Sequence, residues 1–400
     1  MNIGIYAHWG IKRVGQRLFT QGCHARYIRH FLNLNRNVTL FSNTTDADLR
    51  DTQSLEEVTS SRLSVVSVPG GSYAAVWLQN QKLKQIVSAN ISNIDAMYIR
   101  LFDPCPWAVA LVCEEHRVGL VFDMVGDPVA GIWQRRDWSL IGRAIRRMLF
   151  WPEELLTFWI AKRHALLLNG SAVAEAYGHK HPSPEKIISS TLERADFYER
   201  NDTCQGQTIR VLYTGVLRPA KRIETLIDAA HQLQRHSNLR LELRIVGPYE
   251  NKNYFQSLLN RINDLQLNDN VSFAGYVPLG EPLNNEYRQA DIYAFPSLTE
   301  GAARTLLEAS SQSLPSVMTD VGGVSDLFEH GNNALLVPPD DPTAMAHAIL
   351  QFINDGELRR QCIQNAFQMA KTKTCDVFIS EMVNRLAQST SRYKQIPIAA

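Results

Sequence analysis

One segment in the second half of the chain combines residue types that could hold a phosphate. It runs from Gly215 to Arg222, where a glycine follows an apolar run and Arg218, Lys221 and Arg222 supply three cations. A loop of this kind at a strand end lets a ligand approach the backbone and neutralises its negative charge. On its own, the segment is also typical of a solvated turn.

A second segment, from Ser297 to Ala309, places two carboxylates eight residues apart, Glu300 and Glu308. Glu300 precedes a predicted helix, and the glycine after it would let the backbone approach a ligand closely. The first amides of a helix have no partner within the helix and favour negative charge. Here these amides belong to Gly301, Ala302 and Ala303.

Glu308 lies within an apolar run, so a buried carboxylate there would need a partner. Arg304, one helical turn earlier, could supply that partner without any ligand. This simple explanation covers Glu308 but leaves Glu300 unexplained. A third segment contains Gly322 and Gly323 between an expected strand and a helix, which suits a tight turn beneath a ligand or an ordinary connection.

Strand and helix patterns alternate along the chain, which is typical of parallel α/β domains. In the second half, expected strands at 209–214, 241–246 and 292–295 each precede a helix, the clearest of which is at 223–236. Doubly wound sheets bind ligands at the carboxyl ends of their strands. We therefore expect the three segments to gather at one edge of one sheet.

The first half begins with an expected strand at 2–8, a polar loop from His8 to Gly22 and a helix. A polar stretch with two prolines at 179–184 and another polar stretch at 203–207 indicate a domain boundary between about 188 and 207. We expect a first domain, a second domain and a tail that returns to the first, at residues 1–190, 191–375 and 376–400.

Composition and charge exclude several classes of protein. Of the 400 residues, 45% are hydrophobic and 20% charged, as in ordinary globular domains. The net charge of +1 gives no general attraction to nucleic acid, which we do not expect as a partner. The glycine patterns of nicotinamide-dependent enzymes and of P-loop kinases do not occur after the expected strands.

The six cysteines are scattered without a C-x-x-C pair, so we expect reduced thiols rather than a zinc ribbon. The first residues do not resemble a signal peptide, and no apolar run is long enough to span a membrane. We therefore expect a cytoplasmic protein.

Taken together, these ordered motifs resemble the donor domain of the retaining glycosyltransferases of family 4. The resemblance covers residues 207–355 and rests on Gly215 to Lys221, Ala290 to Ser297, Glu300-x7-Glu308, and Asp320 to Gly323 with Leu336 to Pro339. It implies the GT-B fold, in which two Rossmann-like, doubly wound α/β domains face each other across a cleft. The first would bind the acceptor and the second the nucleotide-sugar donor.

The resemblance also implies an activity. The chain would be a hexosyltransferase that moves a sugar, with retention, from a UDP- or GDP-type donor to a glycan or lipid-linked acceptor in surface polysaccharide synthesis. No cofactor is expected, because the nucleotide sugar is a substrate. No metal is expected either, since GT-B enzymes are usually metal-independent.

The matching positions would have distinct roles in such an enzyme. Lys221 would bind the diphosphate, Glu300 the hydroxyls of the transferred sugar, and Glu308 the ribose hydroxyls. The amides of Gly301–Ala303 would lie near the sugar and phosphate, and Tyr276 near the base. The family commonly has an arginine where this chain has Val216, so Arg218 or Arg222 would have to replace it at the diphosphate. A proline is also common in the family at the position of Ala303.

Within the first domain, the family has a glycine-rich loop that touches the acceptor and the phosphate. The loop His8–Gly22 occupies this place, and its candidate residues are Gly10, Gly15 and Gly22. Many relatives place a sugar-contacting histidine after a later strand, where this chain has Asp127. We expect Asp127 to act with Glu300 and Lys221 in catalysis, although Gly126-Asp127-Pro128 also fits a simple turn.

The segment Trp133–Trp151 is basic and rich in tryptophan. Trp138, Ile141, Ile145 and Met148 fall on one face of an expected helix, with Arg143, Arg146 and Arg147 on the other side. This pattern favours a helix on an anionic membrane surface, which would make the protein peripheral on the inner face of the plasma membrane. It also fits an ordinary amphipathic helix with a basic, solvated face.

Two alternatives to sugar transfer remain on the same fold. A sugar-nucleotide epimerase would turn over the donor without an acceptor. A catalytically silent partner subunit would bind a nucleotide or a sister transferase, a reading that Val216 favours and that Lys221, Glu300 and Glu308 oppose.

Overall fold

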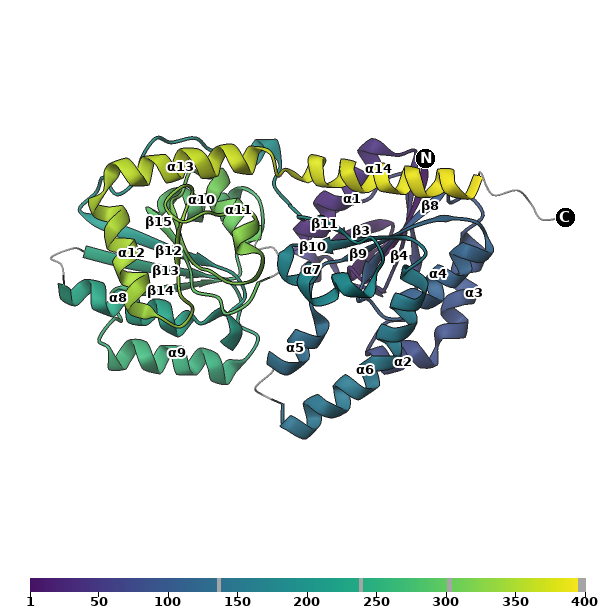
Figure 1. Cartoon of the computed structure of the whole chain (residues 1–400), viewed down its shortest axis with the longest axis horizontal. Helices are drawn as coiled ribbons and strands as arrows, with labels where there is room; N and C mark the ends of the chain where they lie inside the picture. The colour runs from purple at the N-terminus through teal and green to yellow at the C-terminus, as the bar shows by residue number, and fades with distance from the viewer. Residues whose placement is uncertain (135–137, 237–239, 301–303, 395–400) are drawn as a thin grey trace. The chain divides into compact units, whose positions relative to one another are not determined.

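A computed structural model describes residues 1–134, 138–236, 240–300 and 304–394 (Figure 1). The chain divides into two compact units, of which one comprises Met1–Ser189 with Cys375–Ala400 and the other comprises Ser190–Thr374. Each unit is built around its own parallel sheet with helices on both faces. No helix in the described ranges has the length and hydropathy needed to cross a bilayer.

The first unit contains a seven-stranded parallel sheet in the order β11-β10-β9-β8-β1-β4-β7. Its strands are β1 (Asn2–Tyr6), β4 (Asn37–Ser42), β7 (Leu63–Ser67), β8 (Ala96–Leu101), β9 (Gly119–Met124), β10 (Ala165–Asn169) and β11 (Glu185–Ile187). Its helices are α1 (Gly22–Leu34), α2 (Tyr73–Leu78), α3 (Asn80–Asn90), α4 (Pro106–Glu115), α5 (Pro128–Gln134), α6 (Leu140–Ala161), α7 (Ser171–Tyr177) and α14 (Cys375–Lys394).

Side chains of the central strands alternate between the two faces of this sheet, as the pleat requires. In β1, Ile3 and Ile5 pack in the core beneath α1 and α14, whereas Tyr6 packs in the core beneath α3 and α4. Both faces are therefore covered, which explains why these strands are apolar throughout.

The expected polar loop from His8 to Gly22 is instead a hairpin of β2 (Ile11–Val14) and β3 (Arg17–Thr20). It joins β5 (Thr44–Asp46) and β6 (Glu56–Glu57) in a small second sheet. The expectation of a loop was wrong because Ile11, Val14 and Phe19 favour a strand, and the glycine between the strands adopts the positive φ of a turn.

The last described helix, α14, packs on the first unit against α1 and β9. Its buried residues Phe378, Ile379, Met382 and Leu386 belong to the same core as β1. Near its end, the Thr390 hydroxyl donates to the carbonyl oxygen of Asp95 over 3.3 Å. The first unit is therefore completed by a helix that follows the second unit in the sequence.

The second unit contains a six-stranded parallel sheet in the order β14-β13-β12-β15-β16-β17. Its strands are β12 (Thr208–Thr214), β13 (Arg240–Val246), β14 (Val271–Gly275), β15 (Ile292–Phe295), β16 (Ser316–Thr319) and β17 (Leu335–Val337). Its helices are α8 (Ile223–His236), α9 (Lys252–Asp264), α10 (Glu281–Gln289), α11 (Arg304–Ser311), α12 (Pro342–Asn354) and α13 (Gly356–Lys371).

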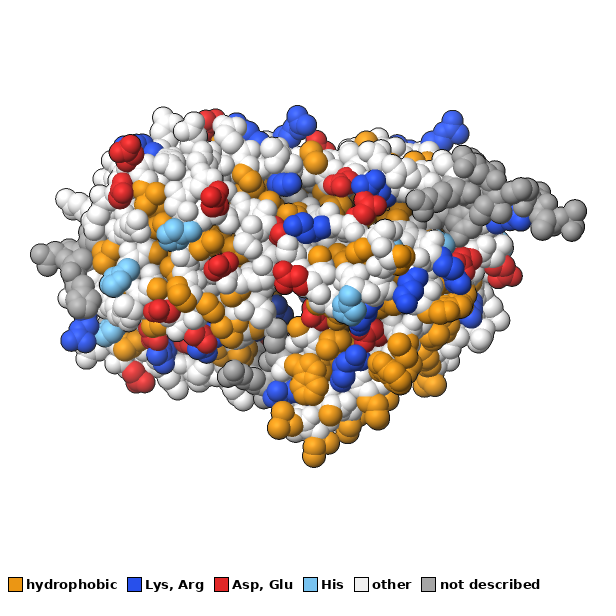
Figure 2. All heavy atoms as spheres, viewed as in Figure 1, with side chains coloured by type: hydrophobic (Ala, Val, Ile, Leu, Met, Phe, Trp, Pro, Cys, Tyr) orange, Lys and Arg blue, Asp and Glu red, His pale blue; other side chains and the backbone are white. Residues whose placement is uncertain are grey.

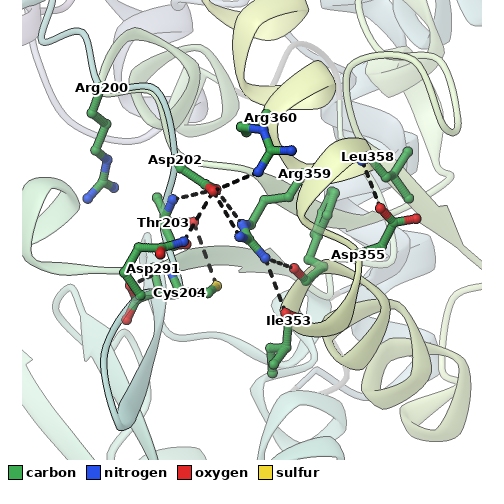
Figure 3. Close-up of polar contacts among 12 residues, drawn as sticks. Arg200, Asp202, Thr203, Cys204, Asp291, Ile353, Asp355, Leu358, Arg359 and Arg360 are labelled. Carbon is green, nitrogen blue, oxygen red and sulfur yellow. Dashed lines mark hydrogen bonds and ion pairs between the residues drawn. The ribbon is translucent and has the colours of Figure 1, made fainter.

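An ion cluster holds the segment of the second unit that precedes β12 (Figure 3). The Asp202 carboxylate accepts hydrogen bonds from Arg359 over 2.6 and 3.0 Å and from Arg360 over 3.2 Å. Burial opposes the charge of Asp202, but these arginine contacts and the Thr203 amide outweigh it and lower the pKa of Asp202. The leading segment is thereby tied to α13.

Candidate functional site

The loops that follow β12 and β15 lie together at the carboxyl edge of the second sheet. These strands are neighbours and run parallel, so their carboxyl ends meet at the same edge. The Leu298 amide donates to the carbonyl oxygen of Ala220 over 2.9 Å, which joins the two loops directly. The first two of the three sequence segments are therefore adjacent in space.

Lys221 and Glu300 form an ion pair at this junction, although they are far apart in sequence. The same Glu300 oxygen, Oε1, accepts a hydrogen bond from the Ser297 hydroxyl over 2.9 Å, and Lys221 Nζ lies 5.2 Å from the Phe295 ring centroid. Both side chains are largely buried, at 13% and 12% exposure. The pair thus presents one cation and one hydroxyl-binding carboxylate at a strand edge that suits ligand binding.

The third segment supports the backbone of Glu300. Gly322 has a φ of +56°, and a Cβ at this position would lie 1.9 Å from the carbonyl oxygen of Glu300. The next amide, that of Gly323, donates to the same oxygen over 3.3 Å. Only a glycine fits here, so the double glycine acts by holding Glu300 in place.

Glu308, on α11, has a partner that sequence reasoning did not identify. The hydroxyl of Tyr287 donates to Glu308 Oε2 over 3.0 Å and lies 2.7 Å from the hydroxyl of Thr214. Burial, reinforced by the negative charge of Glu308, raises the pKa of Tyr287, so this hydroxyl stays protonated and remains a donor. The polar chain orients Glu308 near the end of β12.

Arg218 and Arg222, which could replace the arginine that the family has at the position of Val216, have different partners. Arg222 pairs with Glu224 over 2.7 Å and also with Asp340. Arg218 has a looser contact with Glu250, at 3.8 Å, and about half of its side chain is exposed. Arg218 is therefore the arginine that a ligand could recruit at smaller cost.

Glycines allow close approach of the backbone at this edge. A Cβ on Gly247, which follows β13, would lie 1.9 Å from the carbonyl oxygen of Gly215. Gly275, at the end of β14, has a φ of +68° and no atom within 4 Å of the Cβ it lacks. Tyr276 follows it with half of its surface exposed.

The expected helix-start amides of Gly301, Ala302 and Ala303 lie outside the described residues. Described α11 begins after them, at Arg304.

In the first unit, the expected residues occupy separate places. Gly10 follows β1, Gly15 is at the tip of the β2–β3 hairpin, and Gly22 begins α1. Asp127 follows β9 and starts α5, because its Oδ1 accepts the amides of Val129 and Ala130, both over 2.9 Å.

The Tyr177 hydroxyl also donates to Oδ1 of Asp127, over 2.7 Å. Three donors on one oxygen give this carboxylate a structural role as a helix cap. A catalytic role for Asp127 would fall to its other oxygen and stays a prediction.

A cluster at the same edge of the first sheet was missed from sequence. His8 follows β1 and Asp103 follows the neighbouring strand β8; the His8 amide donates to Asp103 Oδ2 over 3.0 Å. The Tyr6 hydroxyl lies 3.3 Å from His8 Nε2, and Arg100 lies 3.6 Å from the Asp103 carboxylate. Residues 95 positions apart give no local sequence signal, apart from their common place after strands.

Burial is the main influence on His8 and lowers its pKa, although Asp103 acts in the opposite direction. The imidazole is therefore neutral at pH 7 and can accept a proton or a hydrogen bond. Among the residues that the structure describes, no group of three or more His, Cys, Asp or Glu side chains is arranged to hold a metal ion.

Comparison with known proteins identifies the second unit. Residues 197–369 match the family model of the glycosyl transferases group 1. An uncharacterized glycosyltransferase of Methanocaldococcus jannaschii is 28% identical over 179 residues, which cover 45% of this chain and 44% of the relative. A putative colanic acid biosynthesis glycosyltransferase, WcaL of Salmonella typhimurium, is 26% identical over 211 residues, half of each chain.

The matched region thus spans about half the length of these curated relatives. A longer match, with protein CapJ of Staphylococcus aureus, is 24% identical and covers 71% of this chain and 69% of CapJ.

Solved structures match nearly the whole chain. HepE of Anabaena, in complex with UDP, has a TM-score of 0.69 at 18% identity and covers 97% of this chain and 100% of its own. Sucrose-phosphate synthase of Thermosynechococcus elongatus has a TM-score of 0.70 at 18% identity and covers 98% of each chain. At this identity the likeness shows the fold, which is GT-B with two Rossmann-like domains.

Proposed function

We propose that this chain, whose residues 197–369 belong to the glycosyl transferases group 1 family, transfers a hexose from a nucleotide sugar to a glycan or lipid-linked acceptor. The observation that carries the proposal is the Lys221–Glu300 ion pair at the carboxyl edge of the second sheet. In the absence of a ligand, these side chains neutralise each other. A donor would separate them, with its diphosphate on Lys221 and its sugar hydroxyls on Glu300.

The remaining donor contacts follow from the same edge. Glu308, oriented by Tyr287, would accept hydrogen bonds from the ribose hydroxyls. Gly247 lets the loops after β12 and β13 pack closely, Arg218 would swing from Glu250 to the diphosphate, and Tyr276 would stack on the base. The UDP in the HepE complex supports a uridine nucleotide as the first donor to test.

The transfer we propose retains the configuration of the sugar. The bond between the anomeric carbon and the donor phosphate breaks while the acceptor oxygen bonds to the same face of that carbon. The proton of the acceptor hydroxyl passes to the departing phosphate oxygen. Lys221 stabilises the charge that builds on the leaving diphosphate, which is the task a preorganised cation performs best.

The acceptor would bind the first unit. His8 is neutral and, with Asp103, lies at the carboxyl edge of that sheet, so this pair would position an acceptor hydroxyl. The relative WcaL is named for colanic acid synthesis, which supports an acceptor in surface polysaccharide assembly.

A test of this function measures release of nucleoside diphosphate from UDP-, GDP- and ADP-sugars, with and without candidate acceptors. We expect one donor to be used only when an acceptor is present. Lys221→Met should lower the rate by about 10²-fold or more, as for loss of other charge-stabilising groups. Lys252→Met, at an exposed lysine that starts α9, is the matched control and should keep the wild-type rate.

The alternatives give different results in the same assay. Donor turnover without an acceptor would identify an epimerase or hydrolase. Nucleotide binding without any turnover of the panel would identify a silent partner subunit. Equal rates in wild type and Lys221→Met would show that Lys221 does not stabilise the leaving diphosphate.

A further inference from the structure

The outward face of α6 is apolar along most of its length. This face, called the α6 ridge below, consists of Leu140, Ile141, Ile145, Met148, Leu149, Trp151, Leu155 and Trp159, each between 47% and 73% exposed. Figure 2 shows hydrophobic side chains gathered in a band along the helix, with other side chains between them. At 1.5 Å per residue, such a band is about 30 Å long, and patches of this size on a surface indicate a binding function.

The carboxylates of α6 point the other way. Glu153 and Glu154 are each only 3% exposed. Glu153 accepts the Cys105 amide over 2.6 Å and the Trp107 indole over 3.0 Å, and Glu154 pairs with Arg147 and Lys180. The helix therefore has acids inside and large apolar groups outside, the reverse of an ordinary surface helix.

The exposed charged groups of the α6 segment are cations, of which Arg163 pairs with Glu114 of α4 over 3.0 Å. Between residues 138 and 163 the only acids are the two buried glutamates. Arg146 lies 4.0 Å from the ring centroid of Trp138, and Arg163 lies 4.3 Å from that of Trp159. Lys162, at the C-terminal end of α6, is exposed.

The structure changes the surface expected from sequence. The apolar residues extend to Trp159, beyond the expected limit at Trp151, and all three expected arginines have partners within the chain. Arg146 donates to the carbonyl oxygen of Gly142 over 3.1 Å and remains exposed. Arg147 pairs with buried Glu154, and Arg143 donates to the carbonyl oxygens of Trp133 and Trp138. Arg135 and Arg136 lie outside the described residues.

A hollow of about 670 Å³ continues the ridge inward between α6 and the turn at 178–180. Its apolar walls include Trp151, Leu155 and Trp159, and its charged residues include Lys162 and the ion pair of Lys180 with Glu154. Apolar walls beside the exposed Lys162 suit a molecule that has a hydrocarbon part and a negative head.

We propose that the α6 ridge docks on a lipid bilayer that contains anionic lipids. Its leucine, isoleucine and methionine side chains enter the acyl boundary, the tryptophans lie at the headgroup level, and Arg146 and Lys162 meet the phosphates. A second copy of this chain fits less well, because two such ridges would bring like charges together. The proposal does not depend on sugar transfer.

The test is flotation of the full chain with vesicles of phosphatidylcholine, with or without about one third phosphatidylglycerol. We expect wild type to float with the anionic vesicles and only weakly with the neutral ones. The double variant Ile141→Asp/Met148→Asp, at residues 73% and 64% exposed, should lower the bound fraction roughly tenfold. Leu49→Asp/Leu259→Asp makes the same change at exposed residues elsewhere and should float like wild type.

Arg146→Gln/Lys162→Gln separates charge from hydrophobicity, since it should weaken binding to the anionic vesicles alone. Equal binding of wild type to both vesicles, or to neither, would overturn the proposal. So would sedimentation of wild type as a dimer that Ile141→Asp/Met148→Asp converts to a monomer. Nucleotide affinity, measured in parallel, should be the same in every variant, so failure here would leave the proposed transferase activity standing.

Discussion

At the scale of single residues, the proposed donor site depends on the ion pair of Lys221 and Glu300, which a donor must separate. Their largely buried pair, with Ser297 on the same carboxylate oxygen, satisfies both charges before any ligand arrives. Each side chain is thereby held at the strand edge in a defined position. Binding then exchanges one set of charge-assisted contacts for another, which limits affinity but favours a ligand with both phosphate and hydroxyls.

Glu300→Gln should separate these two contributions. Without the carboxylate, Lys221 has no competing anion, so a free nucleoside diphosphate should bind about 5-fold more tightly, equivalent to about 1 kcal/mol. Sugar transfer should fall because the sugar loses its charged acceptor. Calorimetry with the diphosphate and a rate assay with the nucleotide sugar measure the two effects; weaker diphosphate binding would contradict the exchange.

Gly322→Ala should disturb Glu300 through its backbone. The new Cβ would meet the carbonyl oxygen of Glu300, and the φ of +56° adds strain of about 1 kcal/mol. Transfer should drop at least tenfold. Gly331→Ala has a similar φ of +75° with no atom near the new Cβ, so it should cost the same strain and leave the rate unchanged. An equal loss of rate in both variants would refute the supporting role.

At the scale of elements, the unusual feature is α6, which carries its acids inward. Burial raises the pKa of Glu153 to about 7, against the hydrogen bonds from Trp107 and Cys105 that favour its charge. Because the folded pKa of Glu153 lies above its unfolded value, the contribution of protonated Glu153 to the free energy of unfolding is fully present below about pH 4.5. It is lost as the pH rises toward 7.

Glu153→Gln should remove this pH dependence. Wild type should lose up to about 3 kcal/mol of unfolding free energy between pH 4.5 and pH 8 from this one group, and the variant should not. The variant also loses one acceptor, since an amide cannot receive both the Cys105 and Trp107 donors, so it should be less stable at low pH. Thermal midpoints across this pH range test the prediction; parallel curves for the two proteins would contradict it.

The sequence predicted these elements unevenly. The strands expected at 2–8, 209–214, 241–246 and 292–295 correspond to β1, β12, β13 and β15, because strands buried on both faces are apolar runs. The expected helix at 223–236 matches α8. The β2–β3 hairpin was missed because half of the residues in its two four-residue strands are polar. The orientation of α6 could not be predicted because it depends on tertiary contacts of Glu153 and Glu154.

Candidate site residues can be singled out from sequence where they form motifs, but not where only the fold brings them together. Lys221, Glu300 and Glu308 belong to ordered segments, so sequence reasoning could single them out. Tyr287, which orients Glu308, and the pair of His8 and Asp103 come from unrelated segments that meet only at strand ends. No spacing rule connects such residues before the strand order is known.

At the scale of the whole molecule, the chain passes from the first unit to the second and returns through α14. The returning helix contributes Met382, which is fully buried in the core of the first unit. Stability of the first unit therefore depends on residues that follow the second unit in the sequence, and the two units cannot be separated by a single cut.

Met382→Ala should destabilise the first unit alone. Loss of a buried methionine side chain costs about 2–5 kcal/mol. Hydrogen exchange should therefore speed up in peptides from β1, β8 and α1, and should be unchanged in peptides from β12 to α13. Val377→Ala, at a residue 44% exposed, is the control and should change neither set. Faster exchange in the second unit would show that α14 stabilises both.

The central claim is that the carboxyl edge of the second sheet binds the diphosphate of a nucleotide through Lys221. Calorimetric titration of UDP, GDP and ADP into wild type and Lys221→Met tests it most directly. The account predicts that one nucleotide binds wild type at micromolar concentration and binds Lys221→Met at least tenfold more weakly. If none of the three binds, or if the variant binds as tightly as wild type, the donor site is not where this account places it.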